Sequence, residues 1–99
     1  MPVLVMKFGG TSVASIDRIT RAAKRVAREV ALGYDVIVIV SAMSGKTNEL
    51  AGWVNDISPL HDAREYDAVV SSGENVTAGL MALVLQEMEI PARSWQGWQ

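Results

Sequence analysis

The sequence predicts an α/β fold in which an open, mainly parallel sheet carries helices on both faces. Two short apolar runs, Pro2 to Phe8 and Val36 to Val40, have the valine- and isoleucine-rich character of strands that are buried on both sides. An amphipathic pattern of helical length starts at Ile16 and separates the two runs. Two buried strands joined by a helix cross over in a right-handed sense and lie parallel.

The first strand and the helix after it have boundaries that the sequence marks. Gly9-Gly10 ends the strand, and the hydroxyl residues that follow are good helix N-caps. From Ile16 to Val30, apolar residues recur at spacings of three and four, as on the buried face of a helix. Gly33 supplies the left-handed residue that commonly ends a helix, and Asp35 opens the second strand.

A small polar loop and a second helix are predicted after the second strand. The loop runs from Ser41 to Lys46 and is composed of small and polar residues. The helix runs from about Thr47 to Ile57 and has its larger apolar residues on one face. Ser58-Pro59 ends this helix.

The last third of the chain predicts two helical stretches and a third strand. Ala63 to Val70 has a helical pattern, Ser72-Gly73 interrupts it, and a longer helix follows to about Met88. Pro91 blocks further helix, and Ala92 to Trp95 is predicted to begin a third strand. Because a sheet of two or three strands has edges with unpaired backbone groups, we interpret the chain as an incomplete α/β domain.

Composition and charge exclude several classes of protein. Of the 99 residues, 49% are apolar and 20% are charged, as in a globular protein, and the formal net charge of −2 argues against nucleic acid as a partner. The chain has no cysteine, which excludes disulfides and thiolate metal sites. The sequence shows no signal peptide and no apolar stretch approaching the roughly 20 residues of a membrane helix. We therefore expect a cytoplasmic protein that binds neither nucleic acid nor membrane.

The predicted first helix carries cations on its outer face, namely Arg18, Arg21, Lys24, Arg25 and Arg28. Nucleic-acid binding would require aromatic residues between these cations, and there are none, so we interpret them as a solvated face. The single histidine, His61, has no partners for metal binding or nucleophilic catalysis, and no metal-ligating residue is predicted.

Three polar clusters fall where an open α/β sheet binds ligands, beyond the carboxyl ends of its strands. The first is Lys7 to Ser12, at the turn from the first strand into the first helix. Gly9 and Gly10 let backbone N–H groups approach an anion closely, and Lys7 can place its ammonium over the same anion. The alternative is a tight turn with a surface lysine. The G-x-G-x-x-G spacing of a dinucleotide site is absent.

The second cluster, Ser41 to Thr47, ends in Gly-Lys-Thr and so imitates the end of a P-loop. The first glycine of that motif would fall at Val40, and a valine within a strand does not easily adopt the glycine geometry of the loop. A P-loop with Lys46 as its essential lysine is therefore the less favoured interpretation. The favoured interpretation of this cluster is a serine-rich loop that leads into a helix, with Thr47 in the first turn of that helix.

The third cluster, Ser71 to Asn75, lies at the predicted break between the two helical stretches. Glu74 would lie in the first turn of the second stretch, where a carboxylate stabilises the helix dipole. From this cluster alone, that structural role is favoured over a role in binding.

Taken together and in order, the clusters resemble the aspartate kinases, which belong to the amino-acid kinase superfamily. Lys7 to Val13 is similar to the opening signature of these enzymes, and the resemblance continues through Val38 to Met43, Thr47 and Ser72 to Glu74. The resemblance covers the whole chain, and its motifs occur in the family's order and at similar spacing. Arg93 to Gly97 is similar to the strand that leads toward the rest of the family's catalytic domain.

The resemblance implies the amino-acid kinase fold and a site for ATP and L-aspartate. The reaction that it implies is transfer of a phosphoryl group from ATP to the side-chain carboxylate of L-aspartate. The product is 4-phospho-L-aspartate, in the first step of lysine, threonine and methionine biosynthesis. The residues that the resemblance places at the ATP phosphates are Lys7, Phe8, Gly9 and Gly10, with Lys7 catalytic, and those at the amino acid are Thr47 and Glu74.

Elementary chemistry agrees with these roles. The side chain of free aspartate, whose pKa is ordinarily about 3.9, is ionised at neutral pH and needs no general base. Catalysis can then depend on alignment and on neutralising the charge of the transferred group, for which Lys7 and the glycine amides are suited. Glu74 offers a negative partner for the α-ammonium, and Thr47 offers a hydroxyl and an N–H. We expect Mg²⁺ with the ATP, although the sequence shows no ligand for it.

Aspartate kinases are several times longer than this chain. We therefore interpret residues 1–99 as the N-terminal part of the catalytic domain, without the rest of that domain or the regulatory ACT domains, and expect this segment alone to be inactive. The resemblance also implies a homo-oligomeric full-length enzyme. The alternatives are a superfamily kinase acting on acetylglutamate, glutamate or uridylate, a P-loop nucleotidase, and a non-catalytic module that binds a partner through Trp95, Trp98 and an open sheet edge.

Overall fold

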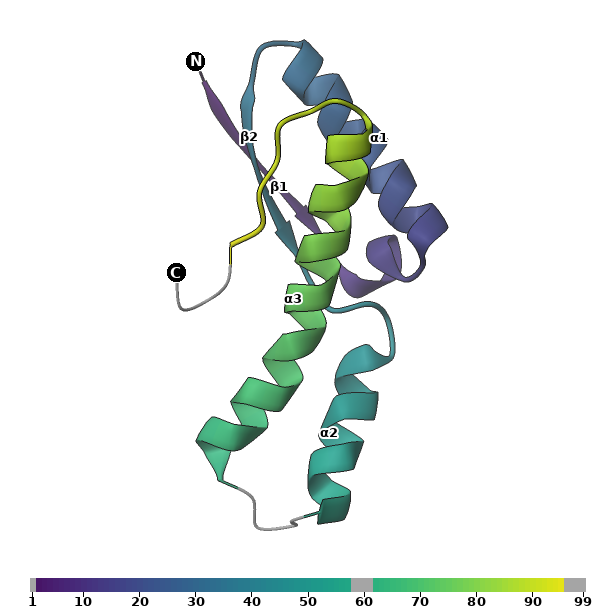
Figure 1. The fold of residues 1–99 in the computed structure, drawn as a ribbon, viewed down its shortest axis with the longest axis vertical. Helices are drawn as coiled ribbons and strands as arrows, with labels where there is room; N and C mark the ends of the chain where they lie inside the picture. The colour runs from purple at the N-terminus through teal and green to yellow at the C-terminus, as the bar shows by residue number, and fades with distance from the viewer. Residues whose placement is uncertain (1, 58–61, 96–99) are drawn as a thin grey trace.

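The computed structural model describes residues 2–57 and 62–95 (Figure 1). In chain order, its elements are β1 (Val3–Phe8), a short 3-10 helix η1 (Gly10–Val13), α1 (Ile16–Ala31), β2 (Asp35–Val40), α2 (Lys46–Ile57) and α3 (Ala63–Glu87). The predicted helix end at Ser58-Pro59, the single histidine His61 and Trp98 lie outside the described residues.

The two strands form a parallel sheet, as the sequence predicts. The register runs from Val3 opposite Asp35 to Phe8 opposite Val40. The connection between the strands contains α1, which packs on the sheet, so the first half of the chain is a β-α-β unit. The parallel pairing brings the carboxyl ends of both strands to the same edge, where the loops that carry the first two polar clusters begin.

Side chains alternate between the two faces of the sheet, and α1 and α3 both pack on one of these faces. Phe8 is buried there with residues of α1 and α3, and the partly buried side chains of the strands that join this core are Met6, Val36, Val38 and Val40. The core residues of α1 are Ile19, Ala22, Ala23 and Val26, and those of α3 are Met81 and Leu85.

The other face of the sheet has no cover from the described residues. It carries Val3, Val5, Ile37 and Ile39, whose exposed fractions lie between 46% and 61%. The continuous apolar runs predict strands that are buried on both sides, and within the described chain the burial is on one side only. The parallel α/β arrangement is thus confirmed, and the helices that the sequence predicts on both faces occupy one face here.

Helix α1 begins and ends at the residues that the sequence marks. The Ser15 Oγ accepts a hydrogen bond of 3.2 Å from the backbone N–H of Arg18, which is N-cap geometry. At the other end, Gly33 has a φ of +98°, the left-handed conformation in which glycine ends helices without a steric penalty. The 3-10 helix η1 between β1 and α1 was not predicted.

Helix α3 is continuous over 25 residues, so the predicted interruption at Ser72-Gly73 is wrong. The Ser72 Oγ donates a hydrogen bond of 2.6 Å to the carbonyl of Val69 and is satisfied by the helix itself. Gly73 is buried, and a Cβ at this position would lie 3.0 Å from the Ala42 Cβ and 3.3 Å from the Leu50 Cδ1. Glycine therefore lets α3 approach the loop after β2 and α2 closely, and it does not mark the end of a helix.

The predicted third strand at Ala92 to Trp95 is also wrong, because these residues have no regular structure. After α3, Glu89 adopts a positive φ of 62° and turns the chain back. The Gln86 Nε2 then donates a hydrogen bond of 2.9 Å to the carbonyl of Ala92. Residues 90–95 line a groove of about 870 Å³ with β2 and α3, so a groove occupies the space that a ladder with β2 would fill.

By length and composition alone, α3 could cross a membrane, so the expectation that no such apolar stretch exists is too strict. Core helices of globular proteins can have the same length and composition. This helix contacts α1, α2 and β2, and its buried residues are Gly73, Thr77, Met81, Ala82 and Leu85. Helix α3 therefore packs on the rest of the unit through one side.

The close approach at Gly73 predicts the effect of adding a side chain there. Gly73→Val should lower the free energy of unfolding by about 1–3 kcal/mol, because the new methyl groups overpack the contact with Ala42 and Leu50. The control is Gly79→Ala in the same helix, where an added Cβ meets nothing within 4 Å. That control should raise the free energy of unfolding by about 0.5–1 kcal/mol, since glycine is unfavourable inside a helix. Urea denaturation measures both, and equal effects would contradict the packing argument.

Candidate functional site

The three polar clusters meet at the carboxyl ends of β1 and β2. The Ser44 N–H donates a hydrogen bond of 3.2 Å to the carbonyl of Gly10, which joins the second cluster to the first. Gly73 lies against Ala42 and Lys46, which joins the third cluster to the second. Segments that are more than 25 residues apart in the sequence are therefore in direct contact where an open α/β sheet binds ligands.

Lys7 lies at the end of β1 on the face of the sheet that the helices leave uncovered. It is opposite Ile39 in the parallel register and is exposed. Phe8, the next residue, points to the covered face and is only 4% exposed. Side-chain alternation in a strand thus separates the cation from the core within two residues.

The turn after Lys7 presents backbone donors. Gly9 is extended, with φ −75° and ψ 171°, and caps η1. Its carbonyl accepts a hydrogen bond of 3.0 Å from the Ser12 N–H. For the amide N–H groups of Gly9, Gly10 and Thr11, the described part of the chain provides no acceptor. Successive backbone N–H groups beside a lysine are suited to an anion such as a phosphate.

The two glycines differ in what surrounds them. A Cβ on Gly10 would lie 2.8 Å from the carbonyl oxygen of Ala42, a distance that real Cβ atoms do not reach, so the contact between the two loops requires glycine. A Cβ on Gly9 would meet nothing within 4 Å, and the φ of Gly9 is open to any residue. Packing within the described chain therefore explains why residue 10 is glycine but does not explain why residue 9 is. A ligand that approaches the backbone closely is a reason for glycine at position 9.

Phe8 contributes to the site through its backbone alone. Its side chain is in the core, and the Arg25 guanidinium carbon lies 5.7 Å from the centroid of its ring, within range of a cation–π interaction. Its carbonyl accepts a hydrogen bond of 3.1 Å from the Ser41 N–H, which connects the ends of the two strands. The ring therefore does not reach the uncovered face, where Lys7 lies.

The second cluster does not form a P-loop. Val40 is the last residue of β2 and pairs with Phe8, so the position of the first P-loop glycine is strand backbone. Gly45 has a φ of +85° and precedes α2, which begins at Lys46, one residue earlier than predicted. The Lys46 Nζ lies 3.3 Å from the Glu49 Oε1. Thr47 is exposed in the first turn of α2, as predicted.

Glu74 lies in the middle of α3 and not in a first helical turn. The proposed role of its carboxylate at a helix dipole therefore does not apply. Glu74 is exposed and lines the groove beside β2 together with Asn75. Among the described residues, its carboxylate has no hydrogen-bond or ion-pair partner. Gly73 packs against Lys46, so the backbone segments that carry Glu74 and Thr47 are adjacent where α2 and α3 meet.

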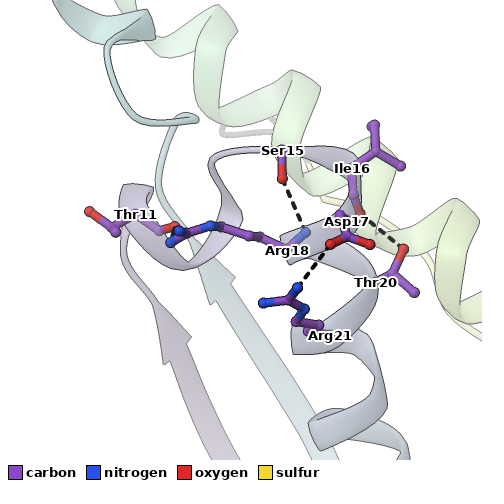
Figure 2. Close-up of polar contacts among 7 residues, drawn as sticks. All are labelled: Thr11, Ser15, Ile16, Asp17, Arg18, Thr20 and Arg21. Atoms are coloured by element: carbon purple, nitrogen blue, oxygen red, sulfur yellow. Dashed lines mark hydrogen bonds and ion pairs between the residues drawn. The ribbon is translucent and has the colours of Figure 1, made fainter.

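Arg18 makes a contact that the sequence did not predict. Its Nη1 donates a hydrogen bond of 3.0 Å to the carbonyl of Thr11 in η1, whereas Arg21 pairs with Asp17 at 3.0 Å along the helix surface (Figure 2). The basic face of α1 is thus only partly a solvated face. The sequence signal is weak: an arginine in the first turn of a helix lies near the chain segment that enters the helix.

Within residues 2–57 and 62–95, no group of three histidine, aspartate or glutamate side chains is placed to hold a metal ion. The acidic residues of this part of the chain lie on the three helices, at Asp35 in β2 and at the ends of α3. A divalent cation at this site would therefore be bound by the ligand's own oxygens or by groups beyond these residues.

The comparisons with known proteins agree on one relationship. The amino acid kinase family model matches residues 2–97. The aspartokinase of Rickettsia felis is 50% identical over 102 residues, which cover all of this chain and 25% of the relative. The aspartokinase of Pseudomonas aeruginosa is 46% identical over 99 residues, again covering the whole chain and 24% of the relative. The chain thus spans about a quarter of the length of the curated relatives it matches.

Two solved structures share the fold. The aspartate kinase from Synechocystis superposes with a TM-score of 0.94 at 43% identity, over 98% of this chain and 17% of that one. Aspartokinase III of E. coli, in complex with aspartate and ADP, superposes with a TM-score of 0.70 over 94% of this chain and 30% of that one. At 23% identity, the second likeness concerns the fold alone.

The contrast between the two glycines gives a prediction on stability. Gly10→Ala should lower the free energy of unfolding by about 1–3 kcal/mol, because its Cβ forces the loop at Ala42 away. Gly9→Ala should leave it unchanged or raise it by up to about 1 kcal/mol, since the native backbone angles suit alanine. Thermal and urea unfolding of the two variants measure this difference. A destabilised Gly9→Ala variant would show that packing, and not a ligand, explains Gly9.

Proposed function

The chain belongs to the amino acid kinase family, and we propose that it is the N-terminal part of the catalytic domain of an aspartate kinase. The observation that carries this proposal is the meeting of three segments at the carboxyl ends of the strands. Among the described residues, these segments carry a lysine, backbone amides without an acceptor, a hydroxyl and an unpaired carboxylate. Relatives named aspartokinase at 43–50% identity across the whole chain support the same assignment.

The reaction that we propose is phosphoryl transfer from ATP to L-aspartate. A side-chain carboxylate oxygen of aspartate attacks the γ-phosphorus, the bond from that phosphorus to the β,γ-bridging oxygen breaks, and ADP leaves with 4-phospho-L-aspartate as the other product. The attacking carboxylate is already ionised at neutral pH, so no proton needs to be removed from it. The protein's task is then alignment and stabilisation of the charge on the transferred group.

Lys7 and the turn after it are suited to the phosphates of ATP. The exposed Lys7 lies on the uncovered face at the strand end, and the amides of Gly9 and Gly10 are free to donate within the described structure. The open space at Gly9 allows a phosphate to approach the backbone closely. We assign Lys7 the catalytic role of neutralising charge that develops on the transferred group. Phe8 would contribute only its backbone.

Thr47 and Glu74 are suited to the amino acid. The unpaired carboxylate of Glu74 can accept a charge-assisted hydrogen bond from the α-ammonium of aspartate. Thr47, in the first turn of α2, offers a hydroxyl and a helix-terminal N–H to a carboxylate. A free amino group is what separates aspartate from acetylglutamate and uridylate, so the Glu74 carboxylate favours aspartate or glutamate over those acceptors.

Mg²⁺ would accompany ATP and offset part of the charge on its phosphates. The described residues of this chain do not fit as its ligand set, because they contain no cluster of carboxylates. We infer that the phosphate oxygens of ATP would hold the ion, and we assign no residue of this chain to it. The remaining three-quarters of the relatives' length would supply the rest of the nucleotide pocket, so residues 1–99 alone should be inactive.

The role of Lys7 predicts a large loss of activity. In the full-length enzyme, Lys7→Ala should lower kcat/KM by about 10²- to 10³-fold, the loss typical when one group that stabilises a charged transition state is removed. The melting temperature should stay the same, because Lys7 is exposed. Coupled detection of ADP release measures turnover. Lys46→Ala should have a much smaller effect, whereas a P-loop enzyme would show the reverse order, and unchanged turnover in Lys7→Ala would refute the proposal.

The role of Glu74 predicts a selective loss of amino-acid affinity. Glu74→Gln should raise the KM for aspartate by about 10- to 100-fold, because a charged hydrogen bond to the α-ammonium is lost, and should leave the KM for ATP within about twofold. Glu87→Gln, on the same helix and also exposed, is the matched control. A panel of acceptors containing aspartate, glutamate, acetylglutamate and uridylate identifies the substrate. An unaltered KM for aspartate would remove Glu74 from the site.

A further inference from the structure

We propose that Arg18 is a positioning residue for the phosphate-binding turn, a role that rests on the proposed function of that turn. Arg18 stands in the first turn of α1 and its Nη1 donates a hydrogen bond of 3.0 Å to the carbonyl of Thr11, seven residues earlier. Thr11 directly follows the glycine pair. The side chain thus connects the long helix to the segment that is expected to meet ATP.

Because peptide groups are planar, the contact of Arg18 with one carbonyl also affects the direction of backbone N–H groups in the turn. In a trans peptide the carbonyl and the following N–H point in opposite directions. Because Arg18 holds the Thr11 carbonyl, it also fixes the direction of the Ser12 N–H, which donates to the Gly9 carbonyl at 3.0 Å. The Gly9 carbonyl and the Gly10 N–H belong to the same peptide group, so the hydrogen bond from Ser12 also fixes the direction of the Gly10 N–H. This N–H points away from Ser12 and has no acceptor among the described residues.

The backbone alone holds the Thr11 carbonyl weakly. Among the described residues, its other donor is the N–H of Ala14, at 3.4 Å, which is long for an N–H···O hydrogen bond. A guanidinium donor makes a shorter and stronger bond than a neutral amide. Arg18 is therefore the principal restraint on this carbonyl, and the four-residue η1 has few others.

A second arginine contacts the other side of the glycine pair. Arg25 lies seven residues after Arg18, about two helical turns, and so on the same face of α1. Its guanidinium lies over the ring of Phe8, the residue just before Gly9. The helix thus contacts the chain immediately before and immediately after Gly9-Gly10. By contrast, Arg21 points along the helix surface to Asp17 and contacts neither side of the turn (Figure 2).

The test compares three variants of the full-length enzyme with the wild type. Arg18→Ala should raise the KM for ATP about tenfold, because the turn no longer holds its amides in place, and should leave the KM for aspartate within about twofold. Arg18→Lys, which keeps a cationic donor, should recover most of that loss. Arg21→Ala, the matched control on the same helix, should stay within about twofold of the wild type in both constants.

The outcomes separate this proposal from the assignment of the enzyme. Lys7→Ala, assayed in parallel, tests the assignment: if it keeps full turnover, the proposed phosphate site is wrong, and so is the role of Arg18. If Lys7→Ala is inactive while Arg18→Ala keeps the wild-type KM for ATP, only the role of Arg18 is overturned. Equal losses of affinity for ATP and aspartate, or no recovery in Arg18→Lys, would also overturn it, since they indicate a general structural defect.

Discussion

Ala42 is packed between two glycines, and this packing holds the three segments of the candidate site together. Its carbonyl oxygen would lie 2.8 Å from a Cβ on Gly10, and its own Cβ would lie 3.0 Å from a Cβ on Gly73. The loop after β2 is therefore held between the turn after β1 and the middle of α3. Without a side chain at either glycine, three segments from different parts of the sequence come into contact. That contact produces the candidate site.

The alternation of side chains in the sheet determines which groups are exposed at this site. Because successive strand residues point to opposite faces, Lys7 is exposed on the uncovered face while Phe8 is buried under α1. Phe8 thus packs in the core while Lys7 exposes its charge, and neither role restricts the other. The apolar side chains that share the face of Lys7 are a reason to regard this unit as part of a larger sheet structure, in line with the quarter of its relatives' length that it spans.

Helix α1 connects the core to the turn. Its buried residues fix it on the sheet, and two of its arginines reach the chain on either side of Gly9-Gly10. Phosphoryl transfer, the reaction proposed for this family member, requires little from a protein except positioned charge and alignment, so the proposed restraint of a few backbone amides would affect it directly. The basic face of α1 therefore has a local structural role that its net charge alone does not indicate.

Local sequence patterns predict the elements with strong periodicity and the residues with special backbone chemistry. The two strands, α1 with its Ser15 cap and its Gly33 end, and the polar cluster at Lys7 to Ser12 follow from local patterns. The parallel pairing follows from the helix that connects the two buried strands. Other features of the fold and of the candidate site depend on contacts between distant parts of the chain. Gly73 and the hydroxyl residues before it signal a helix end locally, but close packing against Ala42 makes glycine favourable inside α3, and this places Glu74 in mid-helix. Residues 92–95 have a strand-like sequence but no ladder, because pairing is a long-range contact that local propensity does not establish. The contact of Arg18 with Thr11 likewise depends on how η1 folds back, which no residue spacing encodes.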